Sequence, residues 1–156
     1  MKERVIALGF FDGVHLGHGA LLRRAAEEAA LRGCTPAVFT FDRPPKEVVT
    51  GVPCPLINSP EDRRDLVRRL YRIQDVLMVP FDREMMTTPW DDFIVRILVG
   101  RYHAVHLVAG HDHHFGHRNQ GTPELLAQKC AQLGLGCDII PKVEQDGITI
   151  SSTYIR

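Results

Sequence analysis

Five short apolar runs divide the chain, and helix-length amphipathic stretches lie between them. The runs are continuous rather than alternating and are rich in β-branched or aromatic residues, which is typical of strands covered on both faces in a parallel sheet. They cover residues 5–9, 37–41, 76–80, 104–109 and 137–140. This alternation of strands and helices predicts an α/β fold: a Rossmann-like, doubly wound parallel sheet of five strands with right-handed crossovers.

The stretches between these runs predict four helices. The first is an apolar stripe over residues 21–30, and Gly33 is expected to end it as a C-cap. Each of the other three has a hydroxyl residue before a proline and acidic residues in the first turn. Such a start suits the free amides and the dipole of a helix N-terminus. The three signals are Ser59 before Pro60, Thr88 before Pro89, and Thr122 before Pro123.

The loops that follow the strands are the expected place for function, because ligands of such sheets bind beyond the carboxyl ends of the strands. The loops after Gly9, Phe41 and Ala109 should therefore meet at one edge of the sheet. They also hold the most unusual sequence in the chain.

Composition narrows the class of protein. A chain of 156 residues with 24% charged and 44% apolar residues is expected to form one soluble domain over residues 1–156. Nineteen basic residues balance nineteen acidic ones, which disfavours a protein that binds nucleic acid or an anionic membrane surface. No apolar run approaches the roughly 18 residues of a membrane span. The four cysteines form no C-x-x-C pair, which favours free thiols and a cytoplasmic location.

The junction of the first strand and the first helix reads GFFDGVHLGH over residues 9–18. It has neither the G-x-G-x-x-G spacing nor the lysine of a Walker loop. A helix N-terminus nevertheless offers amides and a positive dipole end to phosphate. His15 and His18 share a face of the first turn and can donate hydrogen bonds to a polyphosphate, while Gly17 lets the backbone come close. A lone His-x-x-His pair could equally be structural or bind a metal, but the full string favours phosphate binding.

This string resembles the signature of the HxGH nucleotidyltransferase superfamily, and it most resembles the FMN adenylyltransferase domain of bacterial FAD synthetases. Three later segments extend the resemblance over essentially the whole chain. They are AVFTFD at residues 37–42, GHDHHFG at 110–116 with Gly121 beyond, and ISSTYIR at 150–156. The resemblance implies the nucleotidyltransferase (HIGH/HUP-type) fold and transfer of AMP from ATP to FMN, which gives FAD and pyrophosphate. It also implies Mg²⁺ with ATP, and a riboflavin kinase domain or enzyme that supplies FMN, since no kinase domain is expected within residues 1–156.

The resemblance also implies roles for individual residues. The catalytic set, which would hold the phosphates of ATP, is His15, His18, Ser152 and Arg156. The ATP-binding set is Gly9, Phe10, Phe11, Asp12, Gly17, Gly110, Asp112, Ser151 and Thr153. The flavin-binding set is Thr40, Phe41 and Arg43, and no metal ligand is implied. The hydroxyls of residues 151–153, with Arg156 one turn later, also suit an anion on chemical grounds, although an ordinary helix cap with a surface arginine is the alternative.

The chain departs from the family pattern in its substrate loops. The family has Pro-His-Pro where this chain has Arg43, Pro44 and Pro45. The family also has a phenylalanine where this chain has His113. Two other interpretations therefore stay open. One is a different HxGH nucleotidyltransferase, either a cytidylyltransferase or an adenylyltransferase with another phosphomonoester as acceptor. The other is a nucleotide- or flavin-binding module without catalysis.

Six of the eight histidines fall between His103 and His117. Imidazole is a common zinc or nickel ligand, but no cysteine or Glu-x-x-His pattern completes a site, so a native metal site is not expected. His103 and His106 are expected at the start of the fourth strand, on opposite faces. The later ones, His111, His113, His114 and His117, either line a nucleotide pocket or lie in a solvated loop.

Overall fold

The central feature of the fold is a five-stranded sheet with the order β3-β2-β1-β4-β5, in which every neighbouring pair is parallel. The computed structural model describes residues 3–10, 16–42, 50–52, 59–141, 143–145 and 148–150, with the backbone alone for 16–18, 143–145 and 148–150. The strands are β1 (Arg4–Leu8), β2 (Thr35–Phe41), β3 (Asp75–Val79), β4 (Ala104–Gly110) and β5 (Gly136–Ile140). All five expected strands are present, so the predicted α/β class and five-stranded parallel sheet are confirmed.

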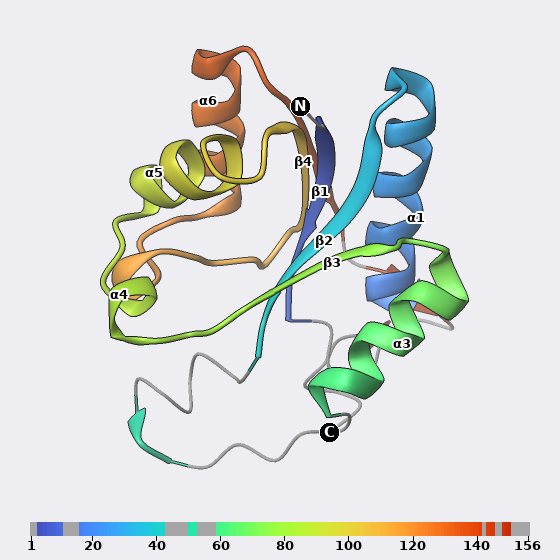
Figure 1. The fold of residues 1–156 in the computed structure, drawn as a ribbon, viewed down its shortest axis with the longest axis horizontal. Helices are drawn as coiled ribbons and strands as arrows, with labels where there is room; N and C mark the ends of the chain where they lie inside the picture. Colours follow the sequence, from blue (N-terminus) through green and yellow to red (C-terminus); the bar gives the residue numbers. More distant parts are fainter. Residues whose placement is uncertain are drawn as a thin grey trace.

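Helices cover both faces of the sheet (Figure 1). On one face, α1 (Leu16–Arg32) packs on β1, β2 and β4, and α3 (Pro60–Tyr71) packs on α1 and β3. On the other face, the π-helix η1 (Phe93–Val99) contacts β4, and α6 (Pro123–Leu133) contacts β4 and β5. The shorter elements are α4 (Arg83–Met86), α5 (Trp90–Asp92), the 3₁₀ turn η2 (His117–Asn119), and the antiparallel pair β6 (Val143–Gln145) and β7 (Ile148–Ile150).

The sheet separates two apolar cores. Successive side chains of a strand point to opposite faces, and β1 shows this plainly: Val5 and Ala7 pack with α1, whereas Ile6 and Leu8 pack with η1 and α6. All four of these side chains are buried. The continuous apolar runs in the sequence thus reflect strands that are covered on both sides.

Three of the predicted helix boundaries have the expected chemistry. The Ser59 hydroxyl accepts a hydrogen bond from the Asp62 amide at 3.1 Å, and the Thr122 hydroxyl accepts one from the Leu125 amide at 3.2 Å. Gly33 follows α1 with a φ of 67°, the left-handed conformation that glycine adopts at little cost.

The expected cap at Thr88 is wrong. Pro89 holds the N-cap position of α5 without a side-chain cap bond, and the Thr88 hydroxyl instead donates to the Glu84 carbonyl at 2.7 Å. The cause is α4, which Asp82 caps and which brings that carbonyl within reach of Thr88. The sequence predicted neither α4 nor the π-helical geometry of η1.

Two further features bear on the earlier expectations. Within the described stretches, no helix combines the length and the apolar character needed to cross a membrane. Of the four cysteines, Cys34, Cys130 and Cys137 are free thiols, and Cys54 lies outside the described residues.

Candidate functional site

A cavity of about 740 Å³ opens where the carboxyl ends of β1 and β2 meet the loop after β4. Gly9 and Phe10 line it from the end of β1, Phe41 from the end of β2, and residues 113–119 from beyond β4. The described ends of these three loops thus meet at one edge of the sheet, as predicted, and residues 11–15 and 43–49 lie outside the described residues. Three other segments complete the described wall, contributed by Phe81, Met85, Met86, Phe93 and Thr50.

The cavity wall is largely aromatic, and its rings hold one another in place. Phe39 contacts Phe41 edge-to-face, with ring centroids 5.5 Å apart, and contacts Phe93 in the same way at 5.3 Å. Phe41 in turn contacts Phe81 at 4.8 Å. Edge-to-face pairs of this kind are favourable beyond the area they bury. The chain therefore presents a preformed apolar slot suited to a flat ring system.

The polar side of the cavity is the histidine-rich loop. Phe115 and Gly121 pair across it as an antiparallel bridge, and the His117 amide donates to the Thr88 carbonyl at 2.8 Å. His113, His114 and His117 line the cavity, whereas His111 is exposed and does not. The sequence left two interpretations open for these four histidines, a pocket lining or a solvated loop. The first holds for His113, His114 and His117, and the second holds for His111.

His113 behaves as an aromatic wall residue. Its ring stacks on Phe115 with centroids 5.8 Å apart and an angle of 16° between the planes. Protein atoms surround the imidazole although part of its surface stays accessible, and this burial lowers the pKa of His113 to about 4, against the opposing effect of Asp112. The side chain is therefore neutral at pH 7 and can still offer a hydrogen bond to a ligand.

The depressed pKa of His113 predicts a loss of stability in mild acid. In the unfolded chain His113 has the ordinary histidine pKa of 6.5, so it binds a proton as the pH falls through that value. In the folded chain it does so only near pH 4. The free energy of unfolding should therefore fall as the pH drops through that window, by at most about 3 kcal/mol from this group. Urea unfolding at several pH values measures it. His113→Phe should flatten the decline, and equal declines in both proteins would contradict the assignment.

The structure describes the two ends of the first strand–helix junction, whereas residues 11–15 lie outside the described residues. The Gly9 amide donates to the Phe39 carbonyl at 3.3 Å, and α1 begins at Leu16, which puts Gly17 and His18 in its first turn. The Phe10 carbonyl accepts two hydrogen bonds, each 2.8 Å long, from the Thr40 hydroxyl and from Arg63. Arg63 was not among the residues predicted from the sequence. The sequence did offer one indication: Arg63 lies four residues before Val67, the other buried residue of α3, and this spacing places both on the same face of the helix.

The structure places the remaining predicted residues in different surroundings. Thr40 is buried and does not line the cavity. Gly110 ends β4 beside α1, since a Cβ on it would lie 3.4 Å from Asp112 Oδ1 and 3.8 Å from Leu21 Cδ1. Neither Gly110 nor Asp112 lines the cavity. Outside the described residues lie Phe11, Asp12, His15, Arg43, Ser151, Ser152, Thr153 and Arg156, together with the side chain of His18.

A second polar cluster lies away from the cavity, where Glu28, His106 and Asp138 bring one potential ligand atom each within 4.8 Å of one another. Arg24 donates to Asp138 at 2.9 Å and to Glu28 at 2.7 Å, and Arg32 donates to Glu28 at 3.1 Å. Burial alone would raise the pKa of Asp138, but the hydrogen bonds from Arg24 and His106 outweigh it and lower that pKa. Because cationic partners already hold both carboxylates, we interpret the cluster as an ion-pair network that joins α1, β4 and β5.

His103 also differs from expectation. It precedes β4 with a φ of 59°. His103 therefore lies outside the strand, and the alternation of strand side chains does not apply to it. The prediction that His103 and His106 lie on opposite faces of the fourth strand is wrong for His103.

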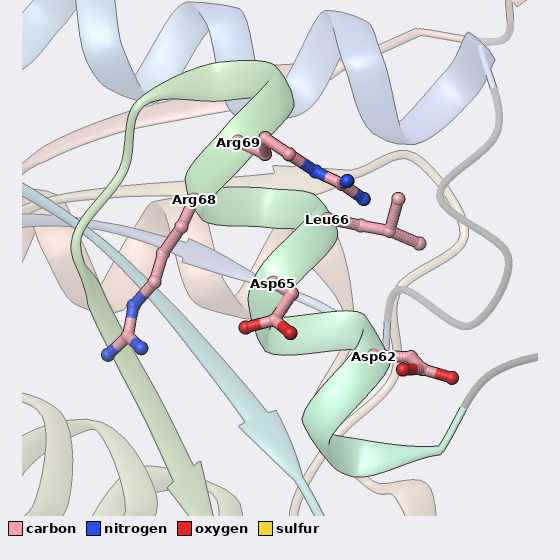
Figure 2. A pocket seen from close by; sticks show the side chains of 5 residues that line it. All are labelled: Asp62, Asp65, Leu66, Arg68 and Arg69. Atoms are coloured by element: carbon pink, nitrogen blue, oxygen red, sulfur yellow. The ribbon is translucent and has the colours of Figure 1, made fainter.

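The described residues form another hollow, on the outer surface of α3 (Figure 2). Its five lining residues all come from that one helix, namely Asp62, Asp65, Leu66, Arg68 and Arg69. Figure 2 shows their side chains extending from the helix in different directions, and all but Leu66 are exposed. An open, charged helix surface offers no convergent donors or apolar wall, so the candidate site remains the aromatic cavity.

The chain is similar to known proteins over nearly its whole length. A family model described as FAD synthetase matches residues 1–154. Bifunctional riboflavin kinase/FMN adenylyltransferases from Listeria monocytogenes and Bacillus subtilis are 34% and 32% identical over 99% of the chain, which covers 49% and 48% of those proteins. A crystal structure described as a macrolide-efflux protein from Streptococcus pneumoniae superposes with a TM-score of 0.83 at 27% identity, over 99% of this chain and 50% of that one. The chain thus spans about half the length of these relatives.

Proposed function

The chain belongs to the FAD synthetase family, and from this premise we propose that it transfers AMP from ATP to the phosphate of FMN. A phosphate oxygen of FMN attacks the α-phosphorus of ATP in line with the leaving group. The bond from the α-phosphorus to the bridging oxygen breaks, and FAD and pyrophosphate are the products. The attacking oxygen is already ionised at neutral pH, so no protein nucleophile is needed, and catalysis consists of positioning and charge stabilisation.

The observation that carries the proposal is the aromatic cavity beside the first strand–helix junction. The isoalloxazine ring of FMN is flat and largely apolar with one polar edge. Phe39, Phe41 and Phe93 offer it an apolar wall, and His113 and Asn119 offer polar groups on the loop after β4. The cavity, of about 740 Å³, falls in the usual size range of small-molecule sites.

ATP is proposed to lie on the α1 side of the same edge. The first turn of α1 would present its free amides and His18 to the phosphates, with His15, Ser152 and Arg156 completing the phosphate site. Gly110 and Asp112 would contact the adenosine, in keeping with the position of Gly110 beside Leu21 of α1. On this proposal the two substrates approach each other across the end of β1, where the strand order reverses direction.

Magnesium is proposed to enter with ATP. The described lining of the cavity contains no aspartate or glutamate, and these side chains are the ones that most often hold this ion in proteins. The described lining of the cavity therefore does not fit a magnesium ion held by protein side chains. We propose that phosphate oxygens of ATP and water carry it, and we assign no step to it.

The proposal extends to the surroundings of the reaction. The relatives from Listeria monocytogenes and Bacillus subtilis are bifunctional with a riboflavin kinase, so a kinase domain or a separate kinase is proposed to supply FMN to this domain of residues 1–156. A cytoplasmic location is proposed as well, supported by the free thiols of Cys34, Cys130 and Cys137.

An acceptor screen tests the proposed function. The protein is incubated with magnesium and ATP, together with FMN, 4′-phosphopantetheine or nicotinate mononucleotide, and separately with CTP and glycerol 3-phosphate. Pyrophosphate release and chromatographic detection of the adenylylated product are the readouts. We expect pyrophosphate and FAD in equal amounts with FMN, and neither when ATP or FMN is omitted.

The other outcomes each select a different function. Faster turnover with another acceptor would assign the chain to a different nucleotidyl transfer. Among the described residues, His113 is the one that favours a different acceptor, because it lines the cavity and replaces a phenylalanine of the family pattern. Binding of ATP and FMN by calorimetry, without product from any acceptor, would identify a non-catalytic binding module.

A further inference from the structure

Arg63 on α3 is fully buried, with 1% of its surface exposed, and it reaches to the carboxyl ends of two strands. Its Nη1 donates to the Phe10 carbonyl at 2.8 Å and to the Thr40 hydroxyl at 3.2 Å. Its Nη2 donates to the Phe41 carbonyl at 2.9 Å and to the Asp42 carbonyl at 3.2 Å. One guanidinium group therefore joins the segment after β1 to the segment at the end of β2.

The same group also contacts the cavity wall. The guanidinium carbon lies 4.2 Å from the ring centroid of Phe10, a cation–π distance, and Phe10 lines the cavity. Arg63 itself does not line it. Its effect on a ligand must therefore pass through Phe10 and Phe41.

A third wall segment is connected through Asp42. The Asp42 carboxylate accepts a hydrogen bond from the Phe81 amide at 3.2 Å, and the Asp42 amide donates to the Val79 carbonyl at 3.1 Å. Phe81 lines the cavity as well. The contacts of Arg63 thus fix, directly or through Asp42, the wall segments that follow β1, β2 and β3.

We propose that Arg63 is a positioning residue for adenylyl transfer, which sets the relative placement of the strand–helix junction after β1 and the flavin wall at the end of β2. This inference rests on the proposed function. On that proposal ATP binds at the first segment and FMN at the second, so the alignment of the attacking oxygen with the α-phosphorus depends on how the two segments are held together. An error of about 1 Å in such alignment can cost about 100-fold in rate.

A planar guanidinium can donate to several oxygens at once in a fixed geometry, whereas an ammonium group is a compact point charge. Arg63→Lys therefore keeps the charge and loses the bridge. We expect kcat at saturating ATP and FMN to fall by about 10- to 100-fold, with a smaller change in either KM. Arg69→Lys is the matched control, because Arg69 is exposed on the same helix and should keep wild-type kcat.

Two measurements separate positioning from a loss of folded protein. Thermal unfolding and far-ultraviolet circular dichroism establish the temperature at which the variant is fully folded, and kcat is compared there. In Arg63→Ala, millimolar guanidinium should restore part of kcat, and sodium chloride at the same concentration should not. If Arg63→Lys does not fold, Thr40→Val tests the same bridge, since it removes the hydroxyl that joins Phe10 to Arg63, and it should lower kcat by about three- to tenfold.

The outcomes distinguish this inference from the function on which it rests. Wild-type protein that forms no FAD overturns the proposed function and this inference with it. Wild-type protein that forms FAD, beside Arg63→Lys with kcat within twofold of wild type, overturns the inference alone. Unchanged kcat in Thr40→Val, or guanidinium that restores no activity to a folded Arg63→Ala, also counts against it.

Discussion

Replacing His18 by alanine is expected to reduce the rate of FAD formation by about 100-fold or more while leaving the melting temperature nearly unchanged. On the proposed mechanism, negative charge moves from the α-phosphate to the leaving pyrophosphate, and an imidazole donor at the start of α1 stabilises it. Position 18 lies in the first turn of that helix. Alanine has the highest helix propensity of the residues, so the helix should tolerate the change. Pyrophosphate release at saturating ATP and FMN measures the rate.

The matched control for this variant is His111→Ala. His111 is exposed, follows β4 and does not line the cavity, so its replacement should leave the rate within about twofold of wild type. Full activity in His18→Ala would remove His18 from the phosphate site. A parallel fall in rate and in melting temperature would identify His18 as a structural residue instead.

Replacing Gly116 by alanine is expected to lower the free energy of unfolding by about 2–5 kcal/mol, a large loss for the addition of a single methyl group. Gly116 has a φ of +79°, which alanine adopts only with strain, and an added Cβ would lie 2.6 Å from Trp90 Cα and 2.8 Å from Trp90 N. Backbone atoms cannot rotate away as the end of a side chain can. Urea unfolding at constant pH provides the measurement.

Gly134→Ala provides a reference for the cost of a side chain at a positive φ without a collision. Gly134 has a similar φ of +74°, but nothing lies within 4 Å of an added Cβ. It should therefore show only the conformational penalty, about 1–2 kcal/mol. The difference between the two variants measures the collision with Trp90 together with the more restricted backbone of Gly116, whose ψ is -179° against 24° at Gly134, and equal losses would show that the loop moves aside. Because Gly116 lines the cavity, its variant should also bind FMN more weakly.

The strands and most of the helix starts could be predicted from the sequence, because they depend on residues that are close together in the chain. Apolar runs formed strands, and the hydroxyls of Ser59 and Thr122 each found the backbone amide three residues later. Both outcomes depend on residues that are near one another in the chain. The position of the cavity could also be predicted from the sequence, because parallel strands bring their carboxyl ends to one edge of the sheet.

Tertiary contacts decided what the sequence left open. Thr88 has the same local signal as Ser59, yet its hydroxyl bonds to a carbonyl of α4 because that helix ends beside it. Arg63 is one of several arginines on α3, and what distinguishes it is its burial and its contacts with distant residues such as Phe10 and Thr40, 53 and 23 residues away. The family resemblance named the residues of the phosphate site, and most of them lie outside the described part of the chain.

The order of the strands also bears on how the chain folds during synthesis. β1 is made first and becomes the central strand of the five, with β2 on one side and β4 on the other. The β1–β2–β3 portion can pair as soon as residues 4–79 have emerged from the ribosome, but one edge of β1 stays unpaired until residues 104–110 follow. That interval exposes an apolar strand edge of the kind that promotes aggregation and recruits chaperones. Because residues 113–119 complete the cavity wall, a ligand of the cavity can stabilise only nascent chains that have passed this stage.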